Sequence, residues 1–178
     1  MDYTKFGTVS IFGSGSERSI KMYNIGDKIV YPMHGAGIIE GIEIKEILGE
    51  ERKYYILNTP HGGMKVMIPV DKSDEIGVRE IIDESQVEEL LKVLSADSTP
   101  MPSNWNRRYR ANMDKMKTGD ILQVAEVARN LYRIDKQKSL SNGEKKMLAN
   151  ALQIMESELV LVKNITTGEA EKMICEVI

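Results

Sequence analysis

The sequence has almost none of the residues that cross-link small folds or bind metals. Its 178 residues include one cysteine, Cys175, and two histidines, His34 and His61. One cysteine excludes an internal disulfide, and these three side chains form a Cys/His zinc site only with help from carboxylates. We therefore predict no metal site and a reducing compartment, the cytoplasm.

Long apolar runs are missing as well. No run reaches the ~18 residues that a membrane-spanning helix requires, and residues 1–21 lack the ~7–15-residue apolar core of a secretory signal. We expect no membrane partner. The Gly-Ser-Gly-Ser run at 13–16 is typical of a linker, so residues 1–21 are interpreted as an extension or artificial addition outside the fold. The alternative is a native edge strand at 8–12.

Charge divides the chain, although the net charge of the whole is only −3. Residues 22–95 hold 8 Lys/Arg against 14 Asp/Glu, a net of −6, whereas residues 101–146 hold 11 against 5, a net of +6. A basic segment attracts polyanions such as nucleic acid, and an acidic segment is repelled by them. We therefore expect two different partners.

The acidic half has the pattern of a small all-β unit. Segments rich in β-branched and aromatic residues predict strands at 28–31, 37–44, 53–57 and 64–69. Four or five short strands predict an SH3-like or Tudor-like barrel, since closing the sheet removes most of its edges. Met64 and Met67 cannot share one face of a regular strand, so one of them should point outward.

From Ser85 onward the spacing of apolar residues changes from every second position to every third or fourth, which is typical of amphipathic helices. Helices are predicted after Asp120 and after Ser141, which forms a capping box with Glu144, and Thr167 is the expected cap of the last one. The fold class is therefore α+β, a small barrel followed by a compact all-α domain. The predicted domains are residues 22–74 and residues 75–178.

No motif points to an enzyme. The nucleophile elbow, the P-loop, the H-E-x-x-H zinc motif and the Rossmann glycine pattern are all absent. We interpret His34 and His61 as turn residues and Cys175 as a residue packed on a helix face. The sequence predicts neither catalysis nor a cofactor.

The segment 102–117 is the most informative one because it contains the only tryptophan, Trp105. Five basic residues follow it: Arg107, Arg108, Arg110, Lys115 and Lys117. On a helix beginning near Asn104, three of them (Arg107, Arg110 and Lys117) share a broad face opposite an apolar stripe. An exposed Trp beside basic residues can stack on or wedge between bases while the cations hold phosphates. The spacing equally allows a buried Trp and arginines that only solvate their helix.

Residues 23–37, YNIGDKIVYPMHGAG, resemble the entry to the RNA-polymerase-interacting domain of the CarD/CdnL family, a domain also found in transcription-repair coupling factors. The resemblance continues at 64–70, 104–112 and 140–148, so it covers essentially all of 22–178. Because the coupling factors share only the first domain, the second half favours CarD/CdnL. The resemblance implies a bacterial transcription regulator that binds the polymerase β subunit through the barrel and promoter DNA through the helical domain.

The resemblance also implies residue roles. Family members pair a barrel edge strand with a strand of β, a form of edge addition, and the positions that match their side-chain contacts are Lys45 and Met67. Some members carry Arg at both places. Compared with arginine, Lys45 keeps the positive charge but lacks the planar guanidinium with its forked donors, and Met67 has neither. Lys65 is a further candidate for the β contact.

In the helical domain the family's tryptophan matches Trp105, and its basic patch matches Arg107, Arg108 and Arg110. The implied role of the Trp is a minor-groove wedge at the upstream edge of the transcription bubble, which stabilises the open promoter complex. Lys115 and Lys117 are further candidates for phosphate contacts. Nothing in the sequence demands a dimer, and a monomer is expected.

Three other functions stay open. The main one is a general scaffold whose barrel binds a peptide strand and whose basic helices bind another protein. A helix-turn-helix repressor would use 121–138 and 144–162, but the apolar stripes of these helices leave few side chains for reading bases. An enzyme is the last alternative.

Overall fold

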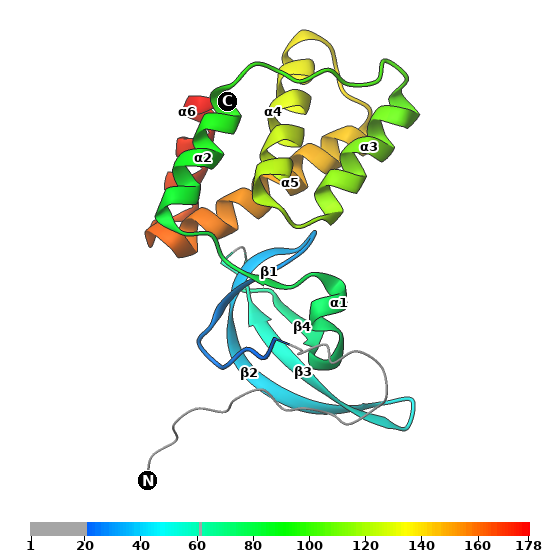
Figure 1. Ribbon diagram of the computed structural model, residues 1–178, viewed down its shortest axis with the longest axis vertical. Coiled ribbons are helices and arrows are strands. Elements are labelled where there is room, and N and C mark those ends of the chain that lie inside the picture. Colours follow the sequence, from blue (N-terminus) through cyan, green and yellow to red (C-terminus); the bar gives the residue numbers. More distant parts are fainter. Residues whose placement is uncertain (1–20, 61) are drawn as a thin grey trace.

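The computed structural model describes residues 21–60 and 62–178, which form an antiparallel sheet followed by a helical bundle (Figure 1). The α+β class predicted from the sequence is confirmed. The alternative strand at 8–12 and the turn residue His61 lie outside the described residues. The strands are β1 (Lys28–Tyr31), β2 (Gly35–Ile47), β3 (Glu50–Asn58), β4 (Lys65–Pro69) and β5 (Arg79–Glu80). The helices are the 3₁₀ turn η1 (Val70–Lys72), α1 (Ser73–Ile76), α2 (Glu84–Ser95), α3 (Trp105–Lys117), α4 (Ile121–Gln137), α5 (Asn142–Lys163) and α6 (Thr167–Val177).

The five strands pair in the order β4-β3-β2-β1-β5, so β4 and β5 are the outer strands of the described sheet. The pairing of β2 with β3 shifts register between Ile39 and Gly41. Such a bulge bends a strand and increases its twist, which lets the long strand β2 follow the apolar core around Ile29, Tyr55 and Leu57. Barrel closure of the SH3 or Tudor type stays a prediction.

Two details of the sheet differ from the sequence expectation. β5 was not predicted, because two residues are too short to show alternation, and it pairs with β1 although it lies within 75–178. Met64 and Met67 are both exposed, at 61% and 49%. Met64 precedes β4, so the alternation of a regular strand applies only to Met67.

Helices α2 to α6 begin at side-chain caps. Asp120 caps α4, and Ser141 and Glu144 form the predicted capping box of α5. The last helix is an exception, because its cap is Thr166 and not Thr167. Glu169 lies three positions after Thr166, so the reciprocal hydrogen bonds of a capping box form with that residue.

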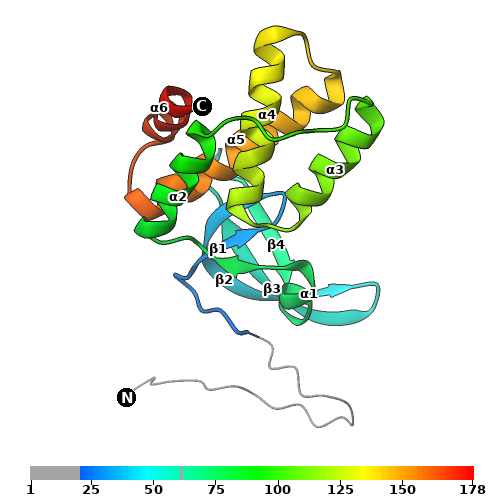
Figure 2. The same ribbon diagram turned by 45° about the horizontal axis from the view of Figure 1, so that its top comes forward.

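Helix α5 lies at the centre of the molecule and is buried on more than one side (Figure 2). Its predicted stripe, which includes Met147 and Met155, packs in the core of the helical bundle. A second set, Ser157, Glu158 and Leu161, is also buried because α5 contacts the sheet. The sequence pattern gave only the first set, since two polar residues do not extend an apolar stripe.

The sheet and the helical bundle meet in a junction of hydrogen bonds around an apolar contact. Val30, Ala36 and Leu161 form a buried cluster, and the amide of Ala36 donates to Ser157 Oγ at 2.8 Å. Lys28 Nζ donates to the carbonyl of Leu161 at 2.8 Å. Because both sides supply buried groups, the two parts are held in one orientation.

Gly35 allows a close approach to Ser157 in this junction, and its replacement by alanine should weaken the packing between the two parts. Its φ is +90°, and an added Cβ would lie 2.6 Å from Ser157 Oγ. Gly26 is a matched control, because its φ is +96° and a Cβ there meets nothing within 4 Å. We expect Gly26→Ala to cost about 1 kcal/mol through backbone strain. Gly35→Ala should cost about 1–3 kcal/mol more through overpacking, as measured by urea unfolding. Equal losses in the two variants would contradict the close packing at Gly35.

Candidate nucleic-acid interface

Trp105 is the first residue of α3, and its side chain is exposed. Asn104 caps the helix, since its side chain accepts a hydrogen bond from the amide of Arg107 at 3.1 Å. Trp105 retains 55% of its accessible surface. The sequence allowed both a buried and an exposed tryptophan, and the structure favours the exposed one.

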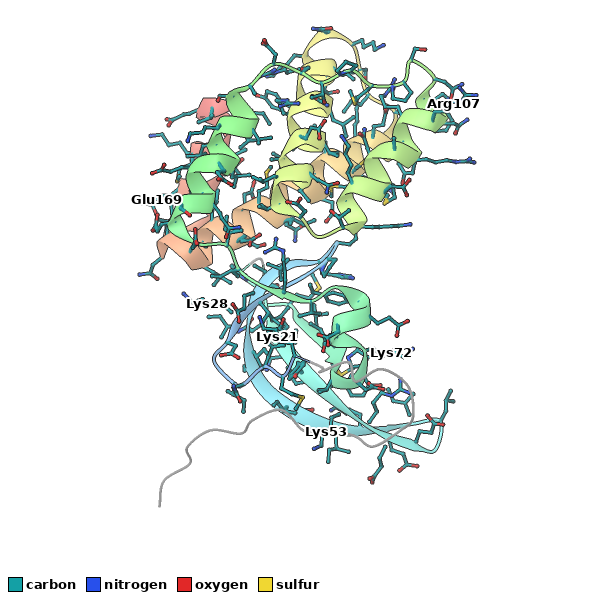
Figure 3. The ribbon with its side chains drawn as sticks, viewed as in Figure 1. Lys21, Lys28, Lys53, Lys72, Arg107 and Glu169 are labelled. Carbon is teal, nitrogen blue, oxygen red and sulfur yellow. The ribbon has the colours of Figure 1, made fainter. Side chains whose placement is uncertain are left out.

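The basic residues of α3 fall into two groups. Arg107, Arg110 and Lys117 are exposed, and no described residue forms a hydrogen bond or an ion pair with their side chains. Figure 3 shows Arg107 pointing away from the bundle at the start of α3. Lys115, in contrast, pairs with Glu126 of α4 at 2.7 Å. Arg107, Arg110 and Lys117, all on the helix that begins with Trp105, are therefore available to bind an anion.

Arg108, which the family resemblance placed in the basic patch, differs from the other arginines of α3 because its side chain is buried. Its Nε donates to Glu144 Oε1 at 2.7 Å, and its Nη2 lies 2.6 Å from the same oxygen. Burial raises the pKa of Glu144, but hydrogen bonds from Ser141 and Arg108 outweigh it and hold the pKa below its usual range. The pair therefore stabilises the fold at neutral pH, and this contribution is lost only as the pH falls through that lowered pKa. Arg108 does not belong to the surface that faces solvent.

Two lysines that the sequence analysis did not select lie close to this surface. Lys145 and Lys146 are exposed in the first turn of α5. That turn packs on α3, because a Cβ on Gly143 would lie 3.3 Å from the ring of Tyr109. The capping box at Ser141 located the start of α5, but no feature of the sequence indicated which helix packs beside it.

Other cations of the basic segment hold the loop that leads to Trp105. Arg129 is buried and donates to the carbonyl of Val93 at 2.9 Å and to Thr99 Oγ1 at 3.3 Å. Arg133 donates to the carbonyl of Ala96 at 2.7 Å. The net charge of the segment thus overstates the charge available at the surface, since part of it satisfies carbonyls inside the molecule.

The residues predicted to bind polymerase share one face of the sheet. Met67 pairs with Ile56, which pairs with Gly41, and Lys45 lies four positions further along β2. Since side chains alternate along a strand, Lys45, Lys65 and Met67 lie on the same face. Lys45 Nζ is 2.7 Å from Glu43, and Lys65 pairs with Glu40. Hydrogen bonding to Lys45 lowers the pKa of Glu43, and hydrogen bonding to Glu40 raises the pKa of Lys65.

Comparison with known proteins accounts for both halves of the chain. The family model described as the CarD-like/TRCF RID domain matches residues 23–82, and the one described as the CarD C-terminal domain matches residues 89–175. The "Putative transcription factor YdeB" of Bacillus subtilis is 44% identical over 145 residues, which are 82% of this chain and 95% of that protein. The chain belongs to the CarD/CdnL family. A solved structure, "CdnLNt from Myxoccoccus xanthus", is 39% identical, covers 40% of this chain and 97% of that one, and has a TM-score of 0.31.

The CarD/CdnL family is one of transcription regulators and not a class of enzymes. Within the described part of this family member, no three His, Cys, Asp or Glu residues could hold a metal ion. No helix there is long and apolar enough to cross a membrane. Cys175 is exposed on α6 and does not pack against a neighbouring helix as predicted. His34 lies in the turn after β1, as expected, with its ring 4.3 Å from that of Tyr31.

The two candidate surfaces of this CarD/CdnL protein face different directions. The start of α3, with Trp105, lies at the end of the helical bundle away from the sheet, and the β2–β3 hairpin extends at the opposite end of the molecule (Figure 1). One surface carries cations that pair with none of the residues the structure describes, and the other carries cations paired with glutamates. A molecule of this kind can contact two partners at the same time.

Proposed function

We propose that the protein regulates transcription initiation by binding the β subunit of RNA polymerase through its sheet and promoter DNA through α3. It stabilises the open promoter complex by inserting Trp105 into the minor groove at the upstream edge of the bubble. The observation that carries this proposal is the exposed tryptophan at the start of a helix, beside arginines without a partner among the described residues. Membership of the CarD/CdnL family supports it.

The tryptophan and the arginines contribute in different ways. Trp105 is large, flat and half-exposed, so it can replace the base stacking that is lost where the duplex opens. Arg107 and Arg110 provide phosphate contacts, which hold the protein on DNA without reading its sequence. Lys117 on α3 and Lys145 and Lys146 at the start of α5 are exposed as well and add positive charge.

Stabilisation of the open complex requires a difference in affinity between open and closed DNA. A protein that bound both forms equally would shift nothing, however tightly it bound. The phosphate contacts are available in both forms, whereas a wedge gains its full contact only where bases are already unstacked. We therefore assign the shift of the equilibrium to Trp105 and the general affinity to the arginines.

The sheet supplies the attachment to polymerase. β4 is an outer strand, so in the described sheet one of its edges has no neighbouring strand and can accept a strand of the β subunit. Met67 on that strand is half-exposed and adds apolar contact. Because Lys45 and Lys65 must leave or share their glutamates to contact β, they contribute less than unpaired cations would. Attachment then raises the local concentration of α3 at the promoter.

The experiment that tests this function is the lifetime of open complexes on a promoter with an unstable bubble, measured with the cognate polymerase. We expect added protein to lengthen the lifetime. An unchanged lifetime, together with demonstrated binding to the β subunit, would reject the open-complex function. It would leave a polymerase-bound scaffold as the better explanation.

The phosphate contacts predict a specific dependence of DNA binding on salt. Replacing Arg107 and Arg110 together by glutamine should reduce the slope of log K against log salt by about 2, since each phosphate contact contributes about 0.9. The matched control replaces Lys72 and Lys172 by glutamine, which removes the same charge at exposed sites outside α3. The slope should stay unchanged in the control. Equal slopes in the two double variants would contradict the assignment of phosphate binding to α3.

A further inference from the structure

The buried arginine of α3 connects three segments that meet at Trp105. Besides its ion pair with Glu144, Arg108 Nη1 donates to the carbonyls of Pro102 at 3.4 Å and Ser103 at 3.3 Å. These carbonyls belong to residues three and two positions before Trp105, and Arg108 lies one turn after it. A single guanidinium thus ties the first turn of α3 to the segment that precedes Trp105.

The partner carboxylate is fixed equally well. Glu144 Oε2 accepts from the amide of Ser141 at 3.2 Å and from Ser141 Oγ at 2.8 Å, whereas Oε1 receives Arg108. One oxygen therefore completes the capping box of α5, and the other binds α3. Since Glu144 is 2% exposed, neither oxygen depends on solvent for a partner.

The start of α3 needs such an anchor for electrostatic reasons. The N-terminal end of a helix carries a partial positive charge and is stabilised by acidic side chains. α3 has no acidic residue in its first turn, and three arginines follow Trp105 within five positions. Repulsion among these charges favours fraying of the first turn, and Glu144 neutralises the one arginine that points inward.

We propose that the Arg108–Glu144 pair is a positioning device that holds Trp105 in the orientation required for DNA, an inference that rests on the proposed function above. The indole is half-exposed, so neighbouring residues cover only part of its surface. A side chain that is already ordered binds more tightly, because less conformational entropy is lost on binding. Arg108 acts through Trp105, and the phosphate contacts remain with Arg107 and Arg110.

Trp105 is the only tryptophan of the chain, so its fluorescence reports on this site alone. The test is time-resolved anisotropy of the free protein, excited where tyrosine does not absorb, for Arg108→Met and for the matched control Arg110→Met on the exposed face. We expect the amplitude of nanosecond motion to rise about twofold or more in Arg108→Met, because the first turn then loses its bonds to Glu144 and to the carbonyls of Pro102 and Ser103. It should stay unchanged in Arg110→Met. Equal amplitudes in the two variants would overturn the proposal.

Measurements of DNA affinity at several salt concentrations distinguish a residue that positions Trp105 from one that contacts phosphate. Arg108→Met should weaken the affinity for DNA with a pre-opened bubble by about threefold to tenfold, the cost of ordering one large side chain, without changing the salt slope. Arg110→Met should reduce the slope by about 1. A reduced slope in Arg108→Met would show that this arginine contacts phosphate and would overturn the proposal.

A milder variant covers the case in which Arg108→Met does not fold. Glu144→Gln keeps an amide oxygen for the capping box and removes the charge that binds Arg108. It should also increase the amplitude of the nanosecond motion of Trp105. An unchanged anisotropy decay in this folded variant would contradict the proposal. Because the anisotropy is measured without polymerase, a failure of the open-complex experiment would leave this result standing, and the two failures are distinguishable.

Discussion

Replacing Trp105 by alanine is expected to return the lifetime of the open complex to its value without the protein, while binding to the β subunit stays unchanged. Stacking of one base on an aromatic side chain contributes about 1–3 kcal/mol, which corresponds to roughly a fivefold to 150-fold change in an equilibrium constant. Since Trp105 is 55% exposed, its removal takes little from the core. The measurement is the dissociation rate of open complexes at saturating protein.

Two controls make this prediction decisive. Trp105→Phe keeps a smaller aromatic ring and should retain part of the effect, because stacking depends on aromatic area. The midpoint of thermal unfolding of Trp105→Ala should lie within a few degrees of the native value, as for an exposed position. A lifetime that stays long in the folded alanine variant would reject the wedge and leave the arginines as the source of stabilisation.

Local sequence signals predicted the elements around this site, because their causes are local. The capping box of Ser141 and Glu144 and the cap at Asn104 depend on residues three positions apart, so the starts of α5 and α3 could be read from the sequence. The strand at 28–31 was predicted at its observed bounds, since its β-branched and aromatic residues and the turn that follows define it. The exposure of Trp105 was not predictable from spacing, because it depends on which helices pack around α3.

The failures share one physical cause, a partner that lies far away in the sequence. Arg108 has the same spacing from its neighbours as an exposed arginine, and only the packing of α5 against α3 brings Glu144 to it. Cys175 was expected to pack on a helix face, but its side chain is exposed among the described residues. β5 was missed because its pairing with β1 joins segments about fifty residues apart, at a length too short for any period.

The junction between the sheet and the helical bundle also depends on two residues that lie far apart in the sequence, Arg79 on β5 and Glu158 on α5. The two groups form a bidentate pair with distances of 2.6 and 3.0 Å. Glu158 also accepts the amide of Ile82 at 2.8 Å, and Arg79 Nε donates to the carbonyl of Gly119 at 2.8 Å. Glu158 is fully buried and the Arg79 side chain is 28% exposed, so the pair joins the sheet, α5 and the turn before α4 with its carboxylate shielded from water.

Glu158→Ala is therefore expected to lower the free energy of unfolding by about 3–5 kcal/mol, the usual cost of breaking a buried ion pair. The matched control is Lys163→Gln, which breaks the exposed pair of Lys163 with Glu84 at 2.9 Å on the same helix and should cost at most about 1 kcal/mol. Combining Arg79→Met with Glu158→Leu should recover part of the loss, because no buried charge is then left without a partner. Equal losses for Glu158→Ala and the control, measured by urea unfolding, would contradict a buried junction.

The same variant tests whether the two surfaces must be held together. At a temperature where Glu158→Ala is still folded, its affinities for the β subunit and for DNA, each measured separately, should remain near the native values. Arg79 and Glu158 lie in neither of the two binding surfaces. The open-complex lifetime should nevertheless shorten. A sheet attached to polymerase raises the local concentration of Trp105 at the bubble only if the junction keeps α3 within reach of it. A native lifetime in this weakened variant would mean that a flexible connection suffices, and that the junction serves stability alone.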